Sequence, residues 1–272
     1  MSGPAGSGGE PPGDRSAPVS PEVFYSRLAP TYREAFEVPH RKAYDRLAWD
    51  AVTGLLPPSS LVVDVGCGVG RWASALVERG HRVIGVEPSP GMAAAARVAS
   101  LGPQFTLHQA TVDEVRLDPG RADAVIAMGS VQYAPDPVAS IARMATWLRP
   151  GGRLWVLVDS LGGLVAELAR RGDHAQAVIR ARTATARLAL GSYTVEHHLF
   201  DAAGLERALD AAGLVEVTVS GLLVGWNSKD RDTAQRDLID HWDAALDRER
   251  ALAAVRGVAD LGKQLLATGR RP

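Results

Sequence analysis

Cysteine is almost absent from this chain of 272 residues, because Cys67 is the only one. A single cysteine excludes a disulfide framework within the chain and a cysteine-rich zinc site. No apolar run reaches the roughly 18 residues of a transmembrane helix, and the N-terminus lacks the basic start and apolar core of a secretory signal. We therefore expect a cytoplasmic protein that binds no membrane and holds no metal.

An excess of charge of either sign is also missing. The chain has 30 Lys and Arg against 31 Asp and Glu, a formal net charge of −1. Without a basic stripe, we do not expect nucleic acid as a partner. Hydrophobic residues make up 46% of the chain, which is enough for one large domain with a buried core. The sequence leaves the oligomeric state open, with a homodimer as one alternative.

The first 20 residues, "MSGPAGSGGEPPGDRSAPVS", are rich in Gly, Pro and Ser and contain almost nothing apolar. Such a segment cannot offset the entropy lost on ordering, so we predict a disordered tail over 1–20. The remaining residues, 21–272, are expected to form a single domain.

Strands and helices alternate from residue 61 onward. Apolar runs predict strands at 61–65, 82–87, 105–110, 122–130 and 153–160, and helical spacing predicts helices at 71–80, 89–102 and 137–152. This alternation is typical of an α/β fold with a parallel sheet and right-handed crossovers. The alternation pauses over 161–200, where two helical stretches are expected at 161–172 and 174–190, and strand-like residues return at 215–224.

The first strand runs into three alternate glycines in "LVVDVGCGVGRW", residues 61–72. A strand that turns through glycines into a helix presents bare backbone amides and a positive helix end to a ligand. Dinucleotide-binding loops follow Gly-x-Gly-x-x-Gly, but Arg71 stands where the third glycine belongs. The spacing therefore disfavours an NAD-dependent oxidoreductase, and Asp64 before the loop can face an ammonium group.

The motif order over residues 24–225 resembles the class I S-adenosylmethionine-dependent methyltransferases. "VVDVGCGVG" resembles their first motif, "VIGVEPSPGM" the strand that ends in an acidic residue, and "LRPGGRLWV" the turn before the fifth strand. The resemblance implies a Rossmann-like sheet of seven mostly parallel strands, one of them antiparallel. It also implies S-adenosylmethionine as the cofactor, with Glu87 accepting hydrogen bonds from the ribose diol.

The N-terminal stretch "FYSRLAPTYREAF" resembles the lid helix of the small-molecule branch that includes the ubiquinone and menaquinone methyltransferases. In that branch, a tyrosine closes over the methionine end of the cofactor, and Tyr25 and Tyr32 match it. "HQATVDEV" resembles the adenine loop, and the loop at 130–137 follows the fourth strand. The resemblance thus implies a set of cofactor-binding residues: Tyr25, Tyr32, Asp64, Gly66, Cys67, Gly68, Gly70, Glu87, Pro88, Met92, Thr111, Val112, Met128, Ser130 and Tyr133.

The segment 161–200 lies where this family often carries a cover over the acceptor, and we predict a helical lid there. Its candidate bases are His197, His198 and Glu167; a histidine titrates near neutral pH. The expected reaction is methyl transfer to a small-molecule acceptor from bacterial specialised metabolism. A non-catalytic module that binds S-adenosylmethionine is the alternative.

Overall fold

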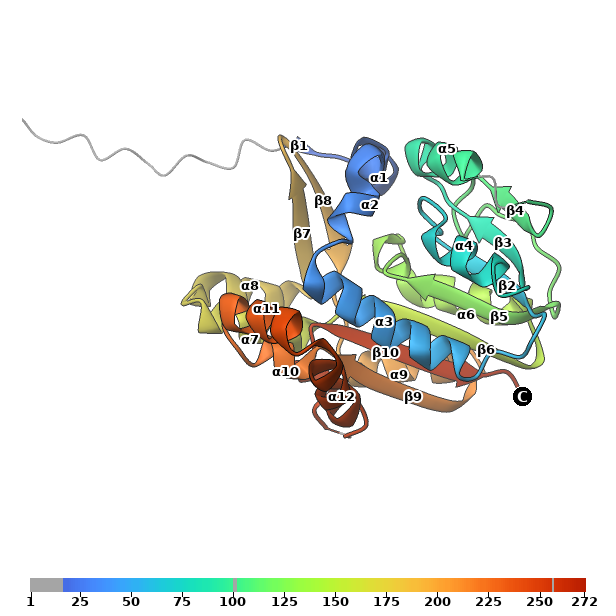
Figure 1. The fold of residues 1–272 in the computed structure, drawn as a ribbon. Helices are drawn as coiled ribbons and strands as arrows, with labels where there is room; N and C mark the ends of the chain where they lie inside the picture. The colour runs from blue at the N-terminus through green and yellow to red at the C-terminus, as the bar shows by residue number, and fades with distance from the viewer. Residues whose placement is uncertain (1–16, 100–101, 256) are drawn as a thin grey trace, which may run out of the picture.

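The structure is a computed structural model that describes residues 17–99, 102–255 and 257–272. Seven strands form its central sheet, in the order β4 (Phe105–His108), β3 (Arg82–Val86), β2 (Leu61–Val65), β5 (Ala122–Met128), β6 (Leu148–Asp159), β10 (Gln264–Arg270) and β9 (Val215–Leu222) (Figure 1). The strands from β4 to β6 pair in parallel, and β10 is antiparallel to both of its neighbours. The fold class implied by the resemblance is confirmed.

Helices cover both faces of the sheet. One face packs against α3 (Pro39–Thr53), α4 (Arg71–Val77), α10 (Val224–Asn227), α11 (Arg231–Asp240) and α12 (Trp242–Ala253), and the other against α6 (Pro137–Trp147) and α9 (Ala202–Ala211). Successive strand residues point to opposite faces, so Val62 joins the first layer of core and Val63 the second. This double coverage explains why the strands read as continuous apolar runs.

Polar caps fix where the helices behind the strands begin. The Ser89 side chain accepts a hydrogen bond from the Met92 amide at the start of α5 (Pro90–Val98), and the Asp136 carboxylate accepts one from the Ala139 amide at the start of α6. A proline follows each cap, where its missing N–H is not needed. Both helices therefore start just beyond the carboxyl edge of the sheet, where ligands bind in this architecture.

The N-terminal segment forms α1 (Pro21–Leu28), η1 (Ala29–Thr31) and α2 (Tyr32–Ala35) in front of the sheet edge (Figure 1). Ahead of them, β1 (Ala17–Pro18) pairs in parallel with a strand of the insertion, and Ser20 caps α1. The predicted disordered tail is therefore wrong for 17–20, because backbone pairing orders this end; its first 16 residues lie outside the described part of the chain.

The insertion after β6 is only partly helical. It contains α7 (Leu161–Arg170), α8 (His174–Thr183) and an antiparallel hairpin of β7 (Thr185–Leu190) and β8 (Tyr193–His198). The expectation that the helix continues to residue 190 is wrong. Ala184 has a φ of +50° and ends α8, and the alternating residues that follow pair with the β-branched and aromatic strand β8.

A short η2 helix (Val131–Tyr133) follows β5, and η3 (Ala259–Leu261) precedes β10. No helix in the described ranges is both long and apolar enough to span a bilayer.

Candidate active site

The three glycines of the turn after β2 all have positive φ, at +70° for Gly66, +57° for Gly68 and +78° for Gly70. Glycine reaches this region without the steric cost that a Cβ brings. A Cβ on Gly66 would lie 2.2 Å from Cβ of Ser130, whereas one on Gly68 would meet only the Tyr32 ring, at 3.8 Å. Gly66 is thus required by close packing, and Gly68 leaves the backbone open to the space in front of the sheet.

Glu87, at the end of β3, ties this turn to the next one. Its Oε2 accepts a hydrogen bond from the Gly68 amide at 2.8 Å, and its Oε1 accepts one from the Ser89 amide at 2.9 Å. Burial raises the pKa of Glu87, and these two amide hydrogen bonds offset part of the increase. Each carboxylate oxygen retains a further lone pair that can accept a hydrogen bond from a ligand.

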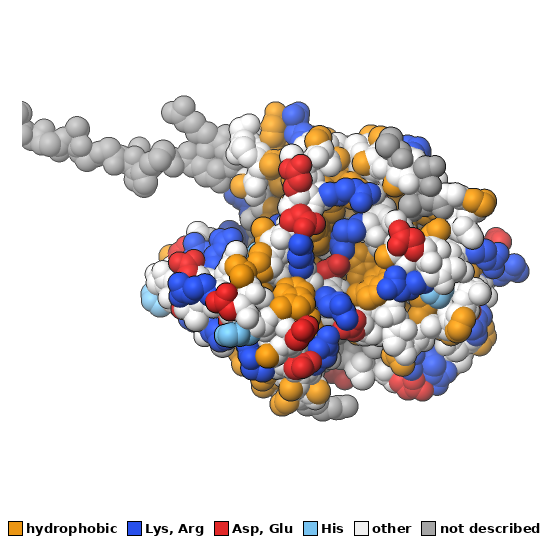
Figure 2. Space-filling view, in the orientation of Figure 1, with side chains coloured by type: hydrophobic (Ala, Val, Ile, Leu, Met, Phe, Trp, Pro, Cys, Tyr) orange, Lys and Arg blue, Asp and Glu red, His pale blue; other side chains and the backbone are white. Residues whose placement is uncertain are grey.

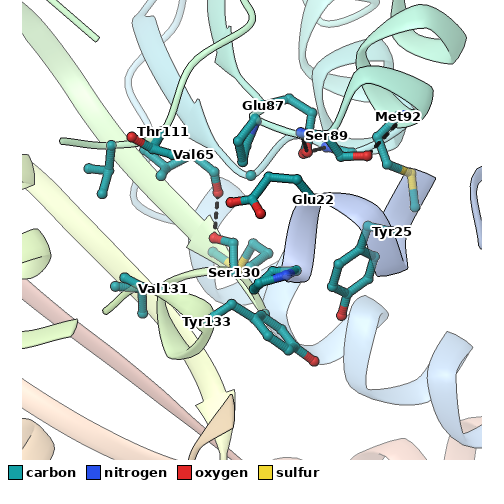
Figure 3. A pocket seen from close by; sticks show the side chains of 18 of the residues that line it. Glu22, Tyr25, Val65, Glu87, Ser89, Met92, Thr111, Ser130, Val131 and Tyr133 are labelled. Atoms are coloured by element: carbon teal, nitrogen blue, oxygen red, sulfur yellow. Dashed lines mark hydrogen bonds between the residues drawn. The ribbon is translucent and has the colours of Figure 1, made fainter. Parts of the chain in front are cut away.

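A cavity of about 240 Å³ opens in front of these turns, and we refer to it as the glycine-loop cavity. Its wall comes from the ends of β2, β3 and β5, the loop after β4 and the first turns of α1 (Figure 3). Three carboxylates line it: Glu22, Glu87 and Asp113. Among the described lining residues there is no Lys, Arg or His, so the cavity favours a cationic ligand.

Most of the cofactor-binding residues implied by the resemblance lie in the wall of this cavity. They are Tyr25, Tyr32, Gly66, Gly68, Glu87, Pro88, Met92, Thr111, Val112, Met128, Ser130 and Tyr133. Two of them already have partners. The Ser130 hydroxyl donates to the Val65 carbonyl (Figure 3), and the Thr111 hydroxyl donates to the Glu114 carboxylate.

The structure does not bring Asp64, Cys67 and Gly70 to the cavity wall. Cys67 is buried, and its sulfur points back at β3, where a Cβ on Gly85 would lie 2.8 Å from it. Gly70 is the N-cap of α4. Asp64 is 2% exposed, and its Oδ2 has no hydrogen-bond partner among the described residues. Burial raises the pKa of Asp64 to about 7, an effect that the charge of Arg71 opposes and that of Glu87 reinforces.

Two carboxylates of the wall were missed by sequence reasoning. Asp113 lies two positions beyond Thr111, the residue that occupies the position where the family often has an acid, so the loop still supplies a carboxylate. Glu22 comes from the first turn of α1 and extends toward the middle of the cavity (Figure 3). Asp113 could have been found in "TVDEV", but no local signal marks Glu22, because tertiary packing alone brings α1 to this place.

A second cavity of about 530 Å³ adjoins the first, and we refer to it as the histidine cavity. The two cavities share five lining residues: Tyr25, Tyr32, Met128, Gly129 and Tyr133. The rings of Tyr25 and Tyr133 meet edge to face with centroids 5.2 Å apart. Figure 2 shows Lys and Arg side chains gathered around a hollow with an apolar floor, on the face that carries α2 and α3.

The buried His197 and the half-buried Asp159 form a pair in the wall of the histidine cavity. Nε2 of His197 lies 3.1 Å from Oδ2 of Asp159, and the Gln132 amide donates to the same oxygen at 3.2 Å. Burial alone would raise the pKa of Asp159, but its hydrogen bond to His197 and the charges of His197 and Lys263 outweigh burial and lower it. An ionised Asp159 accepts the Nε2 proton, which leaves Nδ1 of His197 as an acceptor. Nδ1 is buried and has no partner among the described residues.

The other two candidate bases are less suitable. His198 follows His197 in β8, so it points to the opposite side of the hairpin, and it lines neither cavity. Glu167 lines the histidine cavity but forms ion pairs with Lys263 at 3.0 Å and Arg171 at 3.7 Å. Burial alone would raise the pKa of Glu167, but the ion pair with Lys263 and the charges of Arg171 and Arg170 together outweigh burial and lower it. A weakly basic, ion-paired carboxylate is a poor proton acceptor.

Comparison with known proteins finds methyltransferases among the proteins that this chain resembles. Residues 62–152 match a family model described as a methyltransferase domain. An uncharacterized methyltransferase of Mycobacterium tuberculosis strain H37Rv is 38% identical over 123 residues, which are 44% of this chain and 49% of that protein. A ubiquinone biosynthesis O-methyltransferase of Xanthomonas campestris is 34% identical over 102 residues, or 36% of this chain and 43% of that protein. The chain thus spans about half the length of these curated relatives or less.

The fold as a whole also has solved counterparts. One is a S-adenosylmethionine-dependent methyltransferase from Thermotoga maritima, described as a possible histamine N-methyltransferase. It is 18% identical, has a TM-score of 0.58, and the match covers 92% of this chain and 99% of that one. Residues 62–152 therefore match a methyltransferase domain in sequence, the fold matches that of a methyltransferase, and the resemblance to the S-adenosylmethionine-dependent methyltransferases is confirmed.

Proposed function

We propose that this chain binds S-adenosylmethionine in the glycine-loop cavity and methylates a small molecule held in the histidine cavity. The observation that carries the proposal is the shared wall: the two cavities meet at Tyr25, Tyr32 and Tyr133, and the Asp159–His197 pair lies on the acceptor side. A relative described as a ubiquinone biosynthesis O-methyltransferase supports a small-molecule acceptor.

The chemistry of the cavity wall fits this cofactor. S-adenosylmethionine carries an ammonium, a sulfonium and one carboxylate, so it is a net cation, and the cavity supplies three carboxylates. The Glu87 carboxylate would accept hydrogen bonds from the ribose hydroxyls, and Asp113 would accept one from the adenine amino group. When bound, the cofactor supplies an electrophilic methyl group.

The residues of the histidine cavity would orient the acceptor and take its proton. Asp159 would hold Nε2–H, and Nδ1 of His197 would take the proton of an acceptor hydroxyl as the new bond to carbon forms. Because Nδ1 is buried, this step requires the bound acceptor to reach it. Tyr25, Tyr32 and Tyr133 would exclude water from the space between the cavities. Burial comes first among the causes that raise the pKa of each of these tyrosines, so their hydroxyls stay protonated and carry no charge near neutral pH.

Two measurements test the proposal. Titration calorimetry with S-adenosylhomocysteine should show one binding site, and NADH should show none. Incubation with methyl-labelled cofactor and a panel of phenols, amines and polyketide acceptors should then yield a labelled product. Tight NADH binding would refute the cofactor assignment. Cofactor binding without product from any acceptor would favour the alternative of a non-catalytic binding module.

The cellular location, the source of the acceptor and the oligomeric state also belong to the proposed function. We infer a cytoplasmic protein whose acceptor comes from bacterial specialised metabolism. Cell fractionation tests the location, and sedimentation of the purified chain decides between a monomer and a homodimer.

A further inference from the structure

The histidine cavity contains more positive charge than its carboxylates neutralise. Its lining includes five Lys and Arg residues but only three carboxylates. Asp45 pairs with Arg71, Glu167 pairs with Lys263, and Asp159 is held by His197. All three carboxylates of the wall are therefore already engaged.

Two guanidinium groups in this wall have only neutral partners among the described residues. The Arg180 side chain, from α8, donates to the Thr185 carbonyl at 3.4 Å and to the Gln176 side chain at 3.1 Å. The Arg41 side chain, from α3, donates to the Ala35 carbonyl at 3.1 Å. Both side chains are half-buried, where a charge without a counterion is costly. Their remaining N–H groups suit the planar, bidentate geometry of a carboxylate.

Nearby His40 lies among the same positive charges. It lines the same cavity and stacks on Trp226, with ring centroids 5.2 Å apart, and its Nδ1 has no partner among the described residues. Burial, followed by the charges of Lys263 and Arg41, lowers the pKa of His40 to about 4. His40 is therefore uncharged at neutral pH, and its neighbours repel a further positive charge.

The hairpin register places Arg180 close to the candidate base. Arg180 donates to the carbonyl of Thr185, the residue next to Ala186, and Ala186 is the direct cross-strand neighbour of His197. Cross-strand neighbours have Cα atoms about 5 Å apart, and the rise along a strand is about 3.3 Å per residue. A molecule the size of an aromatic acid can therefore reach both groups.

We propose that the methyl acceptor is an organic acid whose carboxylate binds the guanidinium of Arg180, with Arg41 adding positive charge, while its hydroxyl faces His197. This inference rests on the proposed function and assigns the class of its substrate. The acidic glycine-loop cavity takes the cationic cofactor, and the basic histidine cavity takes an anionic acceptor.

The test uses the full chain loaded with S-adenosylhomocysteine, whose binding is measured first. Three probes share one ring and one pair of hydroxyls: 3,4-dihydroxybenzoate, its carboxamide, and 3,4-dihydroxybenzylamine. We expect the acid to bind about 10- to 100-fold more tightly than the amide, the range for a hydrogen-bonded charged pair, and the amine to bind most weakly.

Matched variants locate the effect. Arg180→Gln should reduce the affinity for the acid to that for the amide and leave the amide unchanged. Arg182→Gln, on the same helix but exposed and outside the cavity, should keep the preference for the acid. The proposal is overturned if the amide or the amine binds as tightly as the acid, if Arg180→Gln keeps the preference, or if no probe binds at millimolar concentration. Failure to bind S-adenosylhomocysteine would instead refute the proposed function, and the preference for the acid can still be measured on the free protein.

Discussion

The two cavities are neighbours, but they differ in charge and in origin. The glycine-loop cavity is acidic, and most of its wall comes from short segments that directly follow strands of the sheet. The histidine cavity is basic, and its wall comes from α2, α3, the end of β6, the insertion and β10. One part of a ligand site can thus come from a local sequence motif, and the adjoining part from elements that lie far apart in the chain. Under the proposed function, the glycine-loop cavity serves one cofactor, whereas the residues of the histidine cavity can differ with the acceptor.

The largest expected effect separates the two cavities by function. His197→Ala should lower methyl transfer by about 10²- to 10⁴-fold, the usual contribution of a general base, because Asp159 then has no imidazole to orient. Cofactor affinity should be unchanged, because His197 does not line the glycine-loop cavity. Steady-state kinetics and calorimetry measure the two quantities. His198→Ala, on the outer side of the same strand, is the control, and equal losses in both variants would remove His197 from the mechanism.

A substitution in the glycine loop should act on cofactor affinity, which the His197 substitution leaves unchanged. Gly68→Val should weaken S-adenosylhomocysteine binding by roughly a hundredfold or more, because the side chain enters ligand space and strains a backbone at φ +57°. Gly80→Val places the same side chain at φ +84°, where nothing lies within 4 Å, and controls for the strain alone. Calorimetry on both folded variants makes the comparison. Equal affinities would show that the loop does not hold the cofactor.

Removal of one carboxylate should have a smaller effect. Glu87→Ala should cost about 1.5–3 kcal/mol of cofactor binding, because it removes a charged hydrogen-bond acceptor and frees the Gly68 and Ser89 amides. Glu78→Ala, on α4 and outside both cavities, is the matched control. A dissociation constant that stays the same in Glu87→Ala would remove this residue from the site.

The smallest effect on ligand binding is expected at Asp64. Substitution of this residue should instead alter how the free energy of unfolding depends on pH. The pKa of Asp64 rises on folding from its ordinary 3.8 to about 7 because the group is buried. The folded state thus holds a proton that the unfolded state loses, and the free energy of unfolding falls as pH rises from about 4 to about 7. The free energy of unfolding of Asp64→Asn, measured in urea, should lack this fall. The stability of the variant relative to the wild type should therefore increase between pH 5 and pH 8. Parallel curves for the two proteins would mean that Asp64 titrates normally.

Sequence reasoning succeeded where the structure depends on residues that are neighbours in the chain. The bounds of β2 and the start of α4 follow from an apolar run and three glycines, and Glu87 follows from its position at the end of the next strand. It failed where pairing partners lie far apart in the chain. Residues 185–190 have enough alanine and leucine to read as a helix, but pairing with β8 makes them a strand. A strand's partner is not visible in its own periodicity.

By itself, the sequence determined the order of strands and helices, the glycine turn and the acidic residue that faces it, because spacing and backbone conformation are local properties. Only the tertiary structure decided which histidine points inward, which carboxylates remain unpaired with a cation, and where positive charge collects. The sequence does not distinguish His197 from His198. Because side chains alternate along β8, His197 faces the histidine cavity and His198 faces away from it. Likewise, Glu22 and Arg180 acquire their roles only when α1 lines the glycine-loop cavity and α8 lines the histidine cavity, because burial and electrostatic fields depend on distances in space rather than along the chain.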